Sequence, residues 1–329
     1  MQSLEALMSS LAIPPPEVTK PISFKRILVG TDFSETSRRA LFYALALAKR
    51  YGAELRLLHA LRPQPQEAIP DEPLPGELSR EELQAKQDLL EFEQVAGIRE
   101  FPHKDEIVSG DVADVLSSVI DRDQPDLLVL GTHGRAALKK LALGSLAEQA
   151  VRVAPCPVLT VGPHVANPSG TEATFKSILF ATDFGAASLR AFPLALAIAE
   201  EYGAKLVLVH MIPPVSFADV AAGSYGAAAY SEGGIHAWHG QLSAESLRKL
   251  HDLIPPGTKL ASTPVCSVET SFLPEGILEA AAVHKSELIV LGANETRSPR
   301  VAAHLPWAVL HHVVCEAHCP VLTVRSQRS

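Results

Sequence analysis

The sequence is poor in aromatic residues and has no long hydrophobic run. Phe, Trp and Tyr make up 5% of the 329 residues, which argues against the aromatic stacking surfaces that hold single-stranded nucleic acid. Apolar stretches such as residues 191–199 are far shorter than the roughly 20 residues that a membrane-spanning helix needs. Residues 1–18 carry no basic region ahead of their short apolar segment, so they do not resemble a secretory signal.

Positive charge and cysteine are also scarce. The formal net charge is -8 and the isoelectric point is near 5.9, which disfavours nonspecific attraction to nucleic acid or to anionic membranes. Four cysteines in a chain of this length do not make a disulfide framework. We therefore expect a soluble, cytoplasmic protein whose partners include neither nucleic acid nor membranes, with free thiols at Cys156, Cys266, Cys315 and Cys319.

The chain does contain an internal repeat. Its length and its 47% hydrophobic content suit roughly two globular domains. Residues 24–61 align without a gap to residues 175–212 at a constant offset of 151, with identity at 20 of 38 positions. Two later matches, DLLVLG with ELIVLG and CPVLTV with CPVLTV, show that the duplication covers whole domains.

Each half reads as alternating strands and helices. In the first half a continuous apolar strand is followed by the loop TDFSET, a helix that ends near Gly52, and a second strand, which together make a βαβ unit. Strands that alternate with helices predict a doubly wound, open parallel sheet in each half. The expected strands are 26–30, 54–60, 105–109, 126–130 and 157–161, and the expected helices are 37–51, 112–121 and 141–153.

The segment GPHVANPSGTEAT is rich in Gly, Pro, Ser and Thr and marks a linker between the halves. Each half also carries an irregular insertion after its second strand, at 62–79 and at 213–234. The predicted organisation is an N-terminal extension, a first domain, a linker and a second domain at 1–23, 24–162, 163–174 and 175–329.

Glycines and polar residues gather just after the predicted strands of the first half. Asp32 follows the first strand, and Gly131, Gly134 and Gly144-Ser145 follow the fourth with the spacing G-x2-G-x9-G-S. Ligands of open parallel sheets bind at this edge, and glycines before a helix N-terminus leave backbone N–H groups open to an anion. The Asp32 carboxylate could accept a hydrogen bond from an adenine amino group or a ribose hydroxyl. This inventory suits a nucleotide with a polyphosphate chain.

With these residues the chain resembles the universal stress protein family, and within it the branch whose ATP-binding signature is this spaced-glycine pattern. The TDFSET loop, the LLHAL strand end, the CPVLTV termini and the duplication strengthen the resemblance, which runs from Phe24 onward. It implies two open doubly wound domains with adenine nucleotide alpha hydrolase-like or flavodoxin-like winding, and ATP, with or without Mg²⁺, in the first. By resemblance the nucleotide would lie against Gly30, Thr31, Asp32 and Ala60, with Leu130 and Gly131 beside it, and its phosphates against Gly134, Gly144, Ser145 and Leu146.

The second half departs from the signature. At offset 161 the residues that answer Gly134, Gly144 and Ser145 are Glu295, Leu305 and Pro306. A carboxylate at about 4 Å from a phosphate charge would cost about 1 to 4 kcal/mol in partly solvated surroundings, and proline removes an amide donor. We expect the second half to bind ATP weakly or not at all.

Several of these residues also have simpler explanations. Asp32 and its repeat partner Asp183 could be loop or capping aspartates, and Gly131 has a partner, Gly292, in the half without the signature, which suggests a turn after a buried strand. The basic residues Arg135, Lys139 and Lys140 suit a solvated face better than phosphate contacts.

Two histidine patterns are open to a functional interpretation that we do not favour. His59 and His210 end equivalent strands, where packed or hydrogen-bonded histidines are commoner than general bases. The sequence His311-His312-x-x-Cys315-x-x-His318-Cys319 follows no familiar zinc spacing, and Cys319 simply repeats Cys156. We predict no catalytic residue and no metal ligand.

Three functions remain open at the level of sequence. The leading hypothesis is an ATP-binding sensor or regulator of a stress response, with an unidentified protein partner and with the terminal CPVLTV strands pairing the halves as a pseudo-dimer or pairing two chains as a homodimer. A slow ATPase is the enzyme alternative, although neither an SGGxDS loop nor paired HIGH and KMSKS sequences are present. A nucleotide-free scaffold is the third.

Overall fold

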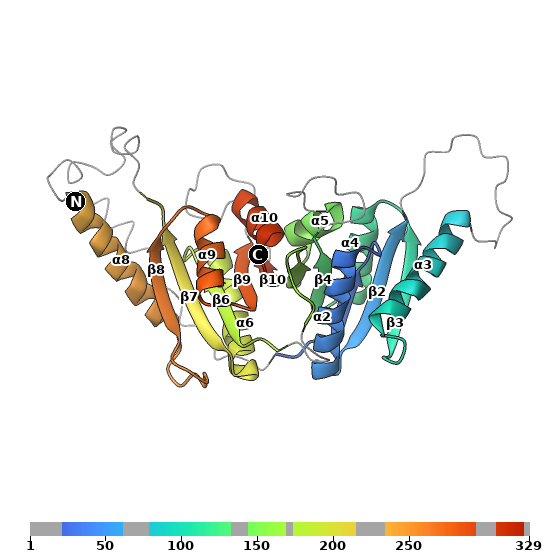
Figure 1. Ribbon diagram of the computed structural model, residues 1–329, viewed down its shortest axis with the longest axis horizontal. Coiled ribbons are helices and arrows are strands. Elements are labelled where there is room, and N and C mark those ends of the chain that lie inside the picture. Colours follow the sequence, from blue (N-terminus) through green and yellow to red (C-terminus); the bar gives the residue numbers. More distant parts are fainter. Residues whose placement is uncertain are drawn as a thin grey trace.

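The structure, a computed structural model, describes residues 22–61, 79–132, 144–168, 174–214, 234–293 and 307–325. Each half runs strand, helix, strand, helix, strand, helix, strand, helix, strand in the same order (Figure 1). In the first half the elements are β1 (Arg26–Gly30), α2 (Glu35–Tyr51), β2 (Glu54–Leu61), α3 (Arg80–Ala96), β3 (His103–Ser109), α4 (Val112–Asp123), β4 (Leu127–Gly131), α5 (Ser145–Val153) and β5 (Val158–Val161). In the second they are β6 (Ser177–Ala181), α6 (Ala186–Tyr202), β7 (Lys205–Ile212), α8 (Gly234–Asp252), β8 (Val265–Thr270), α9 (Glu275–Val283), β9 (Leu288–Ala293), α10 (Trp307–Glu316) and β10 (Val321–Arg325).

The ten strands that the structure describes belong to one sheet in the order β3-β2-β1-β4-β5-β10-β9-β6-β7-β8. Pairing is parallel within each half, and the two halves join where β10 runs antiparallel to β5, with Leu322 opposite Leu159. Thr160 Oγ1 donates to the carbonyl of Val321 and Thr323 Oγ1 to that of Val158, at 3.1 and 3.3 Å. The terminal CPVLTV strands therefore pair within the chain, and the predicted doubly wound fold is confirmed.

Both faces of the sheet are buried, which is why its strands are continuously apolar. Ile27 and Val29 of β1 point into a core covered by α2, α3, α6 and α8, whereas Leu28 between them points into a core covered by α4, α5, α9 and α10. Side chains alternate between faces along a strand, so a run such as Ile-Leu-Val fills both cores at once.

Local sequence explains where the helices begin and end. The Ser34 hydroxyl accepts a hydrogen bond from the Ser37 amide at the start of α2, and Gly52 ends that helix in the left-handed conformation at φ 62°. Ser79 and Glu82 form a capping box at the start of α3, an arrangement in which each side chain satisfies the other residue's backbone N–H.

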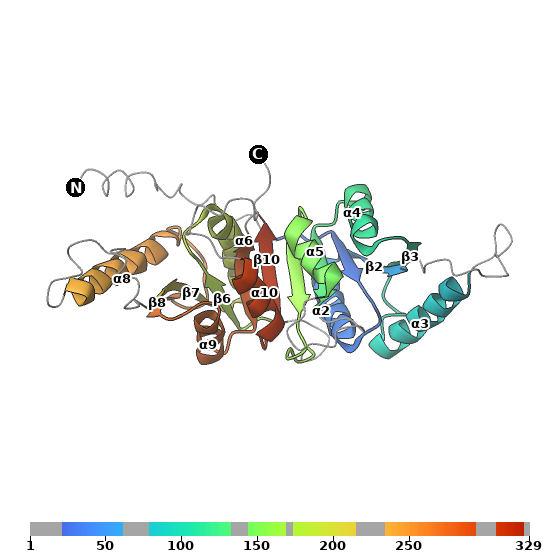
Figure 2. The ribbon, with the colours of Figure 1, turned by 90° about the horizontal axis from the view of Figure 1, so that it is seen from above.

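The two halves also meet through equivalent positions of the repeat. Arg50 and Glu201 occupy the same repeat position, and the guanidinium donates to the Glu201 carboxylate and carbonyl at 3.0 Å each while lying 3.9 Å from the Tyr202 ring centroid. In a two-fold dimer of identical chains, a residue near the axis faces its own copy, and two like charges would meet there. The duplicated chain instead places Arg50 opposite Glu201, so this contact suits a pseudo-two-fold arrangement within one chain. Near the sheet junction α5 and α10 lie side by side (Figures 1 and 2), and the Arg152 guanidinium covers the Trp307 ring at 4.1 Å.

Most expected elements are observed within two residues of their predicted ends, but α3 was not predicted. Helix α2 begins at Glu35, two residues before the expected start, because the cap is Ser34. The expected insertions at 62–79 and 213–234, and residues 141–143 of the expected helix 141–153, fall almost wholly outside the described residues.

Within the described residues, no helix has both the length and the apolar character that crossing a bilayer requires.

All four cysteines are free thiols, as predicted. Burial raises the pKa of Cys156 and Cys319 to about 12 and that of Cys315 to about 11. A thiol with a raised pKa is a poor nucleophile, and Cys315 and Cys319 of the histidine-rich sequence lie in the buried core of the second half.

A network of ion pairs covers the amino ends of the strands in the first half. Arg122 holds Glu106 with two hydrogen bonds of 2.8 and 2.6 Å and also bonds Asp123, whose carboxylate is 2.6 Å from Arg56. Hydrogen bonds from Arg122 hold the pKa of Glu106 and Asp123 below their usual ranges. Carboxyl groups with lowered pKa stabilise the fold above their ordinary pKa near 4, and this contribution is lost as pH falls through the lower folded-state pKa.

We therefore expect the free energy of unfolding to fall more steeply below pH 4 in the native protein than in an Arg122→Gln variant. At pH 7 the variant should be less stable by about 1 kcal/mol, because these groups are partly exposed, and the difference should shrink toward pH 2. Urea unfolding followed by circular dichroism at pH 7, 4 and 2 measures both quantities. A difference that is independent of pH would show that the ion pairs do not carry the effect.

Candidate functional site

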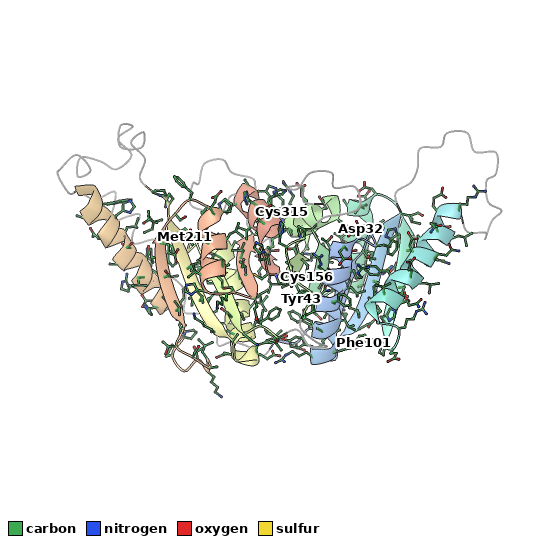
Figure 3. The ribbon with its side chains drawn as sticks, viewed as in Figure 1. Asp32, Tyr43, Phe101, Cys156, Met211 and Cys315 are labelled. Carbon is green, nitrogen blue, oxygen red and sulfur yellow. The ribbon has the colours of Figure 1, made fainter. Side chains whose placement is uncertain are left out.

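The carboxyl ends of β1 and β4 lie side by side at the centre of the first half, where Gly30 pairs with Leu130. Helix α2 follows β1 onto one face of the sheet and α5 follows β4 onto the other. This divergence makes the topological switch point at which open α/β sheets bind ligands. Asp32 lies at this edge of the molecule (Figure 3).

The loop after β1 is held by its own polar side chains. The Thr31 amide donates to the carbonyl of Leu58, and the Thr31 hydroxyl accepts from the amide of Phe33 at 3.0 Å and donates to Ser37 Oγ at 3.2 Å. Thr31 is buried, at 3% exposure. Its side chain therefore fixes the turn into α2 rather than pointing outward.

His59 supports the same loop from the neighbouring strand. Its Nδ1–H donates to the carbonyl of Thr31 at 2.8 Å, and its ring stacks on Phe33 with centroids 4.3 Å apart. Phe33 has a left-handed backbone, at φ 62°, which is costly for a bulky residue and persists only where surrounding contacts hold it. The prediction of a packed, hydrogen-bonded histidine is confirmed here.

Asp32 caps the turn that precedes α2. Its Oδ1 accepts from the amide of Ser34 at 3.1 Å, as the simpler interpretation of this residue predicted. Capping and ligand binding are compatible, since a carboxylate offers about four acceptor positions. The side chain is half-buried and sits at the carboxyl edge of the sheet.

Gly30 is required by close packing on the α5 side of the sheet. A Cβ atom at this position would lie 2.4 Å from the Leu130 side chain and 2.8 Å from that of Leu146. Leu130 is fully buried, and Leu146 is partly buried against the same core. The structure thus brings three predicted site residues together, with Leu130 inside the core and Leu146 at its margin.

Gly131 is required by close packing on the opposite side. A Cβ atom there would lie 2.6 Å from the backbone nitrogen of Ser37 and 2.7 Å from the carbonyl carbon of Thr36. Gly292 stands in the same relation to α6, at 2.3 Å from Ala187 and Ser188 backbone atoms. The conserved geometry in both halves shows that this glycine lets the helix start approach the strand, a stricter demand than the turn expected from sequence.

Gly144 provides the N-terminus of α5. It is the N-cap residue, has no side chain to cover the first amides of the helix, and donates from its own amide to the carbonyl of Thr132 at 2.7 Å. The first amides of a helix have no acceptor within that helix and carry partial positive charge.

Of the remaining residues singled out from the sequence, Ala60 is half-buried at the carboxyl end of β2, beside this edge. Gly134, Arg135, Lys139 and Lys140 lie outside the described residues.

The second half repeats the loop with different polar contacts. Asp183 Oδ1 accepts from the amide of Gly185 at 2.8 Å and from the Ser188 hydroxyl at 2.6 Å. Burial lowers the pKa of His210, whose Nδ1–H donates to the carbonyl of Thr182 at 2.8 Å.

The second half also differs at the positions that answer the glycine signature. Where α5 has Leu146, α10 has the larger Trp307. Glu295, Leu305 and Pro306 lie outside the described residues.

Comparison with known proteins agrees with the duplicated fold. The model of the universal stress protein family matches residues 23–162 and again residues 174–325. The chain belongs to the universal stress protein family. A universal stress protein of Methanocaldococcus jannaschii is 31% identical over 142 residues, which are 42% of this chain and 82% of the relative. One of Thermus aquaticus is 34% identical over 142 residues, again 42% of this chain and 98% of the relative.

Among solved structures, a universal stress protein of Archaeoglobus fulgidus is similar over nearly its whole length. It covers 91% of this chain and 98% of its own, with a TM-score of 0.58 and 18% identity, a likeness that concerns the fold. The single-domain relatives each correspond to one half, so this universal stress protein carries two family domains in one chain.

Sequence reasoning missed the hydroxyl groups that hold the loop. Thr31, Ser34 and Ser37 bond one another across the start of α2, and Thr182 and Ser188 repeat part of this pattern. The signal was present, because Thr31 and Ser37 are both identical in the repeat. It was not diagnostic, since only the turn geometry brings residues six apart into contact.

Proposed function

We propose that this universal stress protein is an adenine nucleotide-binding sensor or regulator of a stress response, acting in the cytoplasm, that holds ATP in its first half. The observation that carries the proposal is the place of the α5 N-terminus beside the carboxyl edge of β1 and β4, where its cap Gly144 donates from its amide to the carbonyl of Thr132, just after β4. Helix N-termini favour phosphate. The spacing of Gly131, Gly134, Gly144 and Ser145 matches the ATP-binding signature that the sequence resembles.

The proposed contacts divide according to burial. Asp32 and Ala60 are half-buried and would meet the adenosine, while Gly134, Gly144, Ser145 and Leu146 would surround the phosphates. Gly30, Thr31 and Leu130 are buried, and Gly131 packs on α2, so these four would act by shaping the site. Mg²⁺ would accompany the phosphates as it does in solution.

The second half would serve as the structural mate of the first. The side chain of Glu295 would repel phosphate, Pro306 lacks an amide proton, and Trp307 replaces the smaller Leu146. We assign no catalytic residue, so hydrolysis would be slow at most. ATP occupancy would change a surface that an unidentified protein partner reads.

Calorimetric titration of the full chain with ATP and Mg²⁺ tests the proposal. The expected result is one site per chain. Two equal sites would contradict the assignment to the first half alone, and absence of binding would leave a scaffold protein. Turnover above about 1 per second in the same samples would place the protein among ordinary enzymes instead.

A further inference from the structure

A compact group of three side chains of the types that bind metal ions joins α3 to β3, away from the site described above. His103 Nε2 lies 3.4 Å from Asp105 Oδ1 and 3.8 Å from Glu93 Oε1, and all three ligand atoms lie within 4.8 Å of one another. His103 and Asp105 are two residues apart on one strand, so they share a face, and Glu93 reaches them from the helix that covers that face.

Glu93 is the least expected member of the group, because it is a buried carboxylate. Its exposed fraction is 5%, and its Oε1 is a buried atom with no hydrogen-bond partner. Burial raises the pKa of this carboxyl, and a hydrogen bond with Asp105 and then the charge of Asp105 raise it further. Burying an acceptor without a partner costs free energy, and the atom that lacks a partner is the one that faces His103.

His103 is oriented in the way that metal-binding histidines usually are. Its Nδ1–H donates to the carbonyl of Phe101 at 2.7 Å, which fixes the ring and directs Nε2 between the two carboxylates. A hydrogen bond from the far ring nitrogen to a backbone carbonyl is the typical support for an imidazole ligand. In this position Nε2 and one oxygen from each carboxylate make a set of one nitrogen and two oxygen ligands.

The two separations from His103 Nε2 are close to those around a tetrahedral ion. Ligand atoms at about 2.0 to 2.1 Å from a tetrahedral Zn²⁺ are about 3.3 Å apart, close to the 3.4 and 3.8 Å observed from His103 Nε2. An octahedral ion such as Mg²⁺ brings neighbouring ligands to about 2.9 Å and prefers oxygen alone. One imidazole with two carboxylates leaves the fourth tetrahedral position to water.

The group is specific to the first half. Leu57 of β2 and Leu208 of β7 are equivalent positions of the repeat. Leu57 pairs with Asp105, whereas Leu208 pairs with Cys266, so the second half has a cysteine where the first has the aspartate. In the part of the chain that the structure describes, no other set of three His, Cys, Asp or Glu residues converges in this way. The fold itself therefore does not require the group.

The group also lies apart from the proposed nucleotide site. Phe101, whose carbonyl orients His103, is at the opposite end of the sheet from Asp32 (Figure 3). His103 begins β3, whereas Asp32 follows the carboxyl end of the parallel strand β1. A ligand at one end would not touch the other.

We propose that Glu93, His103 and Asp105 form a binding site for one divalent transition metal ion with the coordination preferences of Zn²⁺, which ties helix α3 to the edge strand β3. The ion would accept one atom from each side chain and one water molecule. It would satisfy the buried Glu93 oxygen and keep the outermost strand of the first half in place.

Titration of the metal-stripped full chain with ZnCl₂ tests this site. One equivalent should bind, and Glu93→Gln, which keeps the shape but removes the charge, should weaken that equivalent by at least about ten-fold, since even partners of metal ligands have effects of this size. Asp105→Asn should weaken it similarly. Glu91→Gln changes an exposed carboxylate two residues from Glu93 on α3 and should leave Zn²⁺ affinity unchanged.

Two further readouts separate coordination from folding. Co²⁺ in place of Zn²⁺ should give the visible absorption of a tetrahedral site in the native chain and not in Glu93→Gln. Saturating Zn²⁺ should raise the unfolding temperature of the native chain and not that of the variant, whose metal-free stability should equal or exceed the native value because a buried charge is gone. Zn²⁺ binding that Glu93→Gln and Asp105→Asn leave unchanged, or no binding at all, would overturn the proposal.

Discussion

Replacing Gly134 by Glu is expected to abolish most ATP binding to the full chain. The variant copies Glu295 of the second half into the spaced-glycine sequence of the first. A new carboxylate near a phosphate charge should cost about 1 to 4 kcal/mol, which is roughly a 5-fold to several-hundred-fold weaker Kd. Calorimetry at constant ionic strength measures the change.

Gln87→Glu is the matched control for that experiment. It adds the same charge on the exposed side of α3, far from the α5 N-terminus, and should leave ATP affinity within about two-fold, because exposed charges more than about 10 Å apart are largely screened. Equal affinity in all three proteins would contradict a phosphate site at the glycine sequence. Loss of binding in the control as well would point to net charge rather than to position.

Replacing Gly292 by Ala is expected to destabilise the second half by about 2 to 3 kcal/mol, at the upper end of ordinary overpacking. The added Cβ would lie 2.3 Å from backbone atoms of Ala187 and Ser188, and backbone at a helix start cannot rotate away as a side chain can. Urea unfolding at pH 7 measures the loss.

Gly240→Ala provides the opposite control. Gly240 lies inside α8, and a Cβ there would have no neighbour within 4 Å, so alanine should stabilise the protein by about 0.5 to 1 kcal/mol. Because the second half lacks the ATP signature, a penalty at Gly292 cannot come from lost phosphate contacts. If Gly292→Ala were neutral, packing would not explain Gly131, and a direct nucleotide role for Gly131 would gain support.

The two proposed sites divide the first half between its ends. The nucleotide site would use the carboxyl edge near Asp32, and the metal site the amino end of β3 near Phe101 (Figure 3). A metal that fixes α3 against β3 would order the flank of the sheet on the side of β2, whose last residues include Ala60. The sites are independent in their tests, since Zn²⁺ titration needs no nucleotide and ATP titration can be made on metal-stripped protein.

The sequence by itself determined the duplication, the alternating strands and helices, and the departure of the second half from the glycine signature, because these follow from the order of residues along the chain and need no knowledge of which side chains meet. Helix α3 was not predicted, although Ser79 and Glu82 form a capping box at its start. A proline-rich insertion separates it from β2, and the gapless alignment of the two halves ends before that insertion. The site glycines were found, yet their packing partners were not.

Tertiary structure alone decided which atoms meet. Gly131 meets the start of α2, Arg50 meets Glu201 of the other half, and Glu93 meets His103. The first two contacts join residues about 95 and 151 positions apart, and the third joins a helix to the strand that it covers. No spacing in the sequence encodes such contacts, because they depend on how a twisted sheet and its covering helices bring distant side chains to one place.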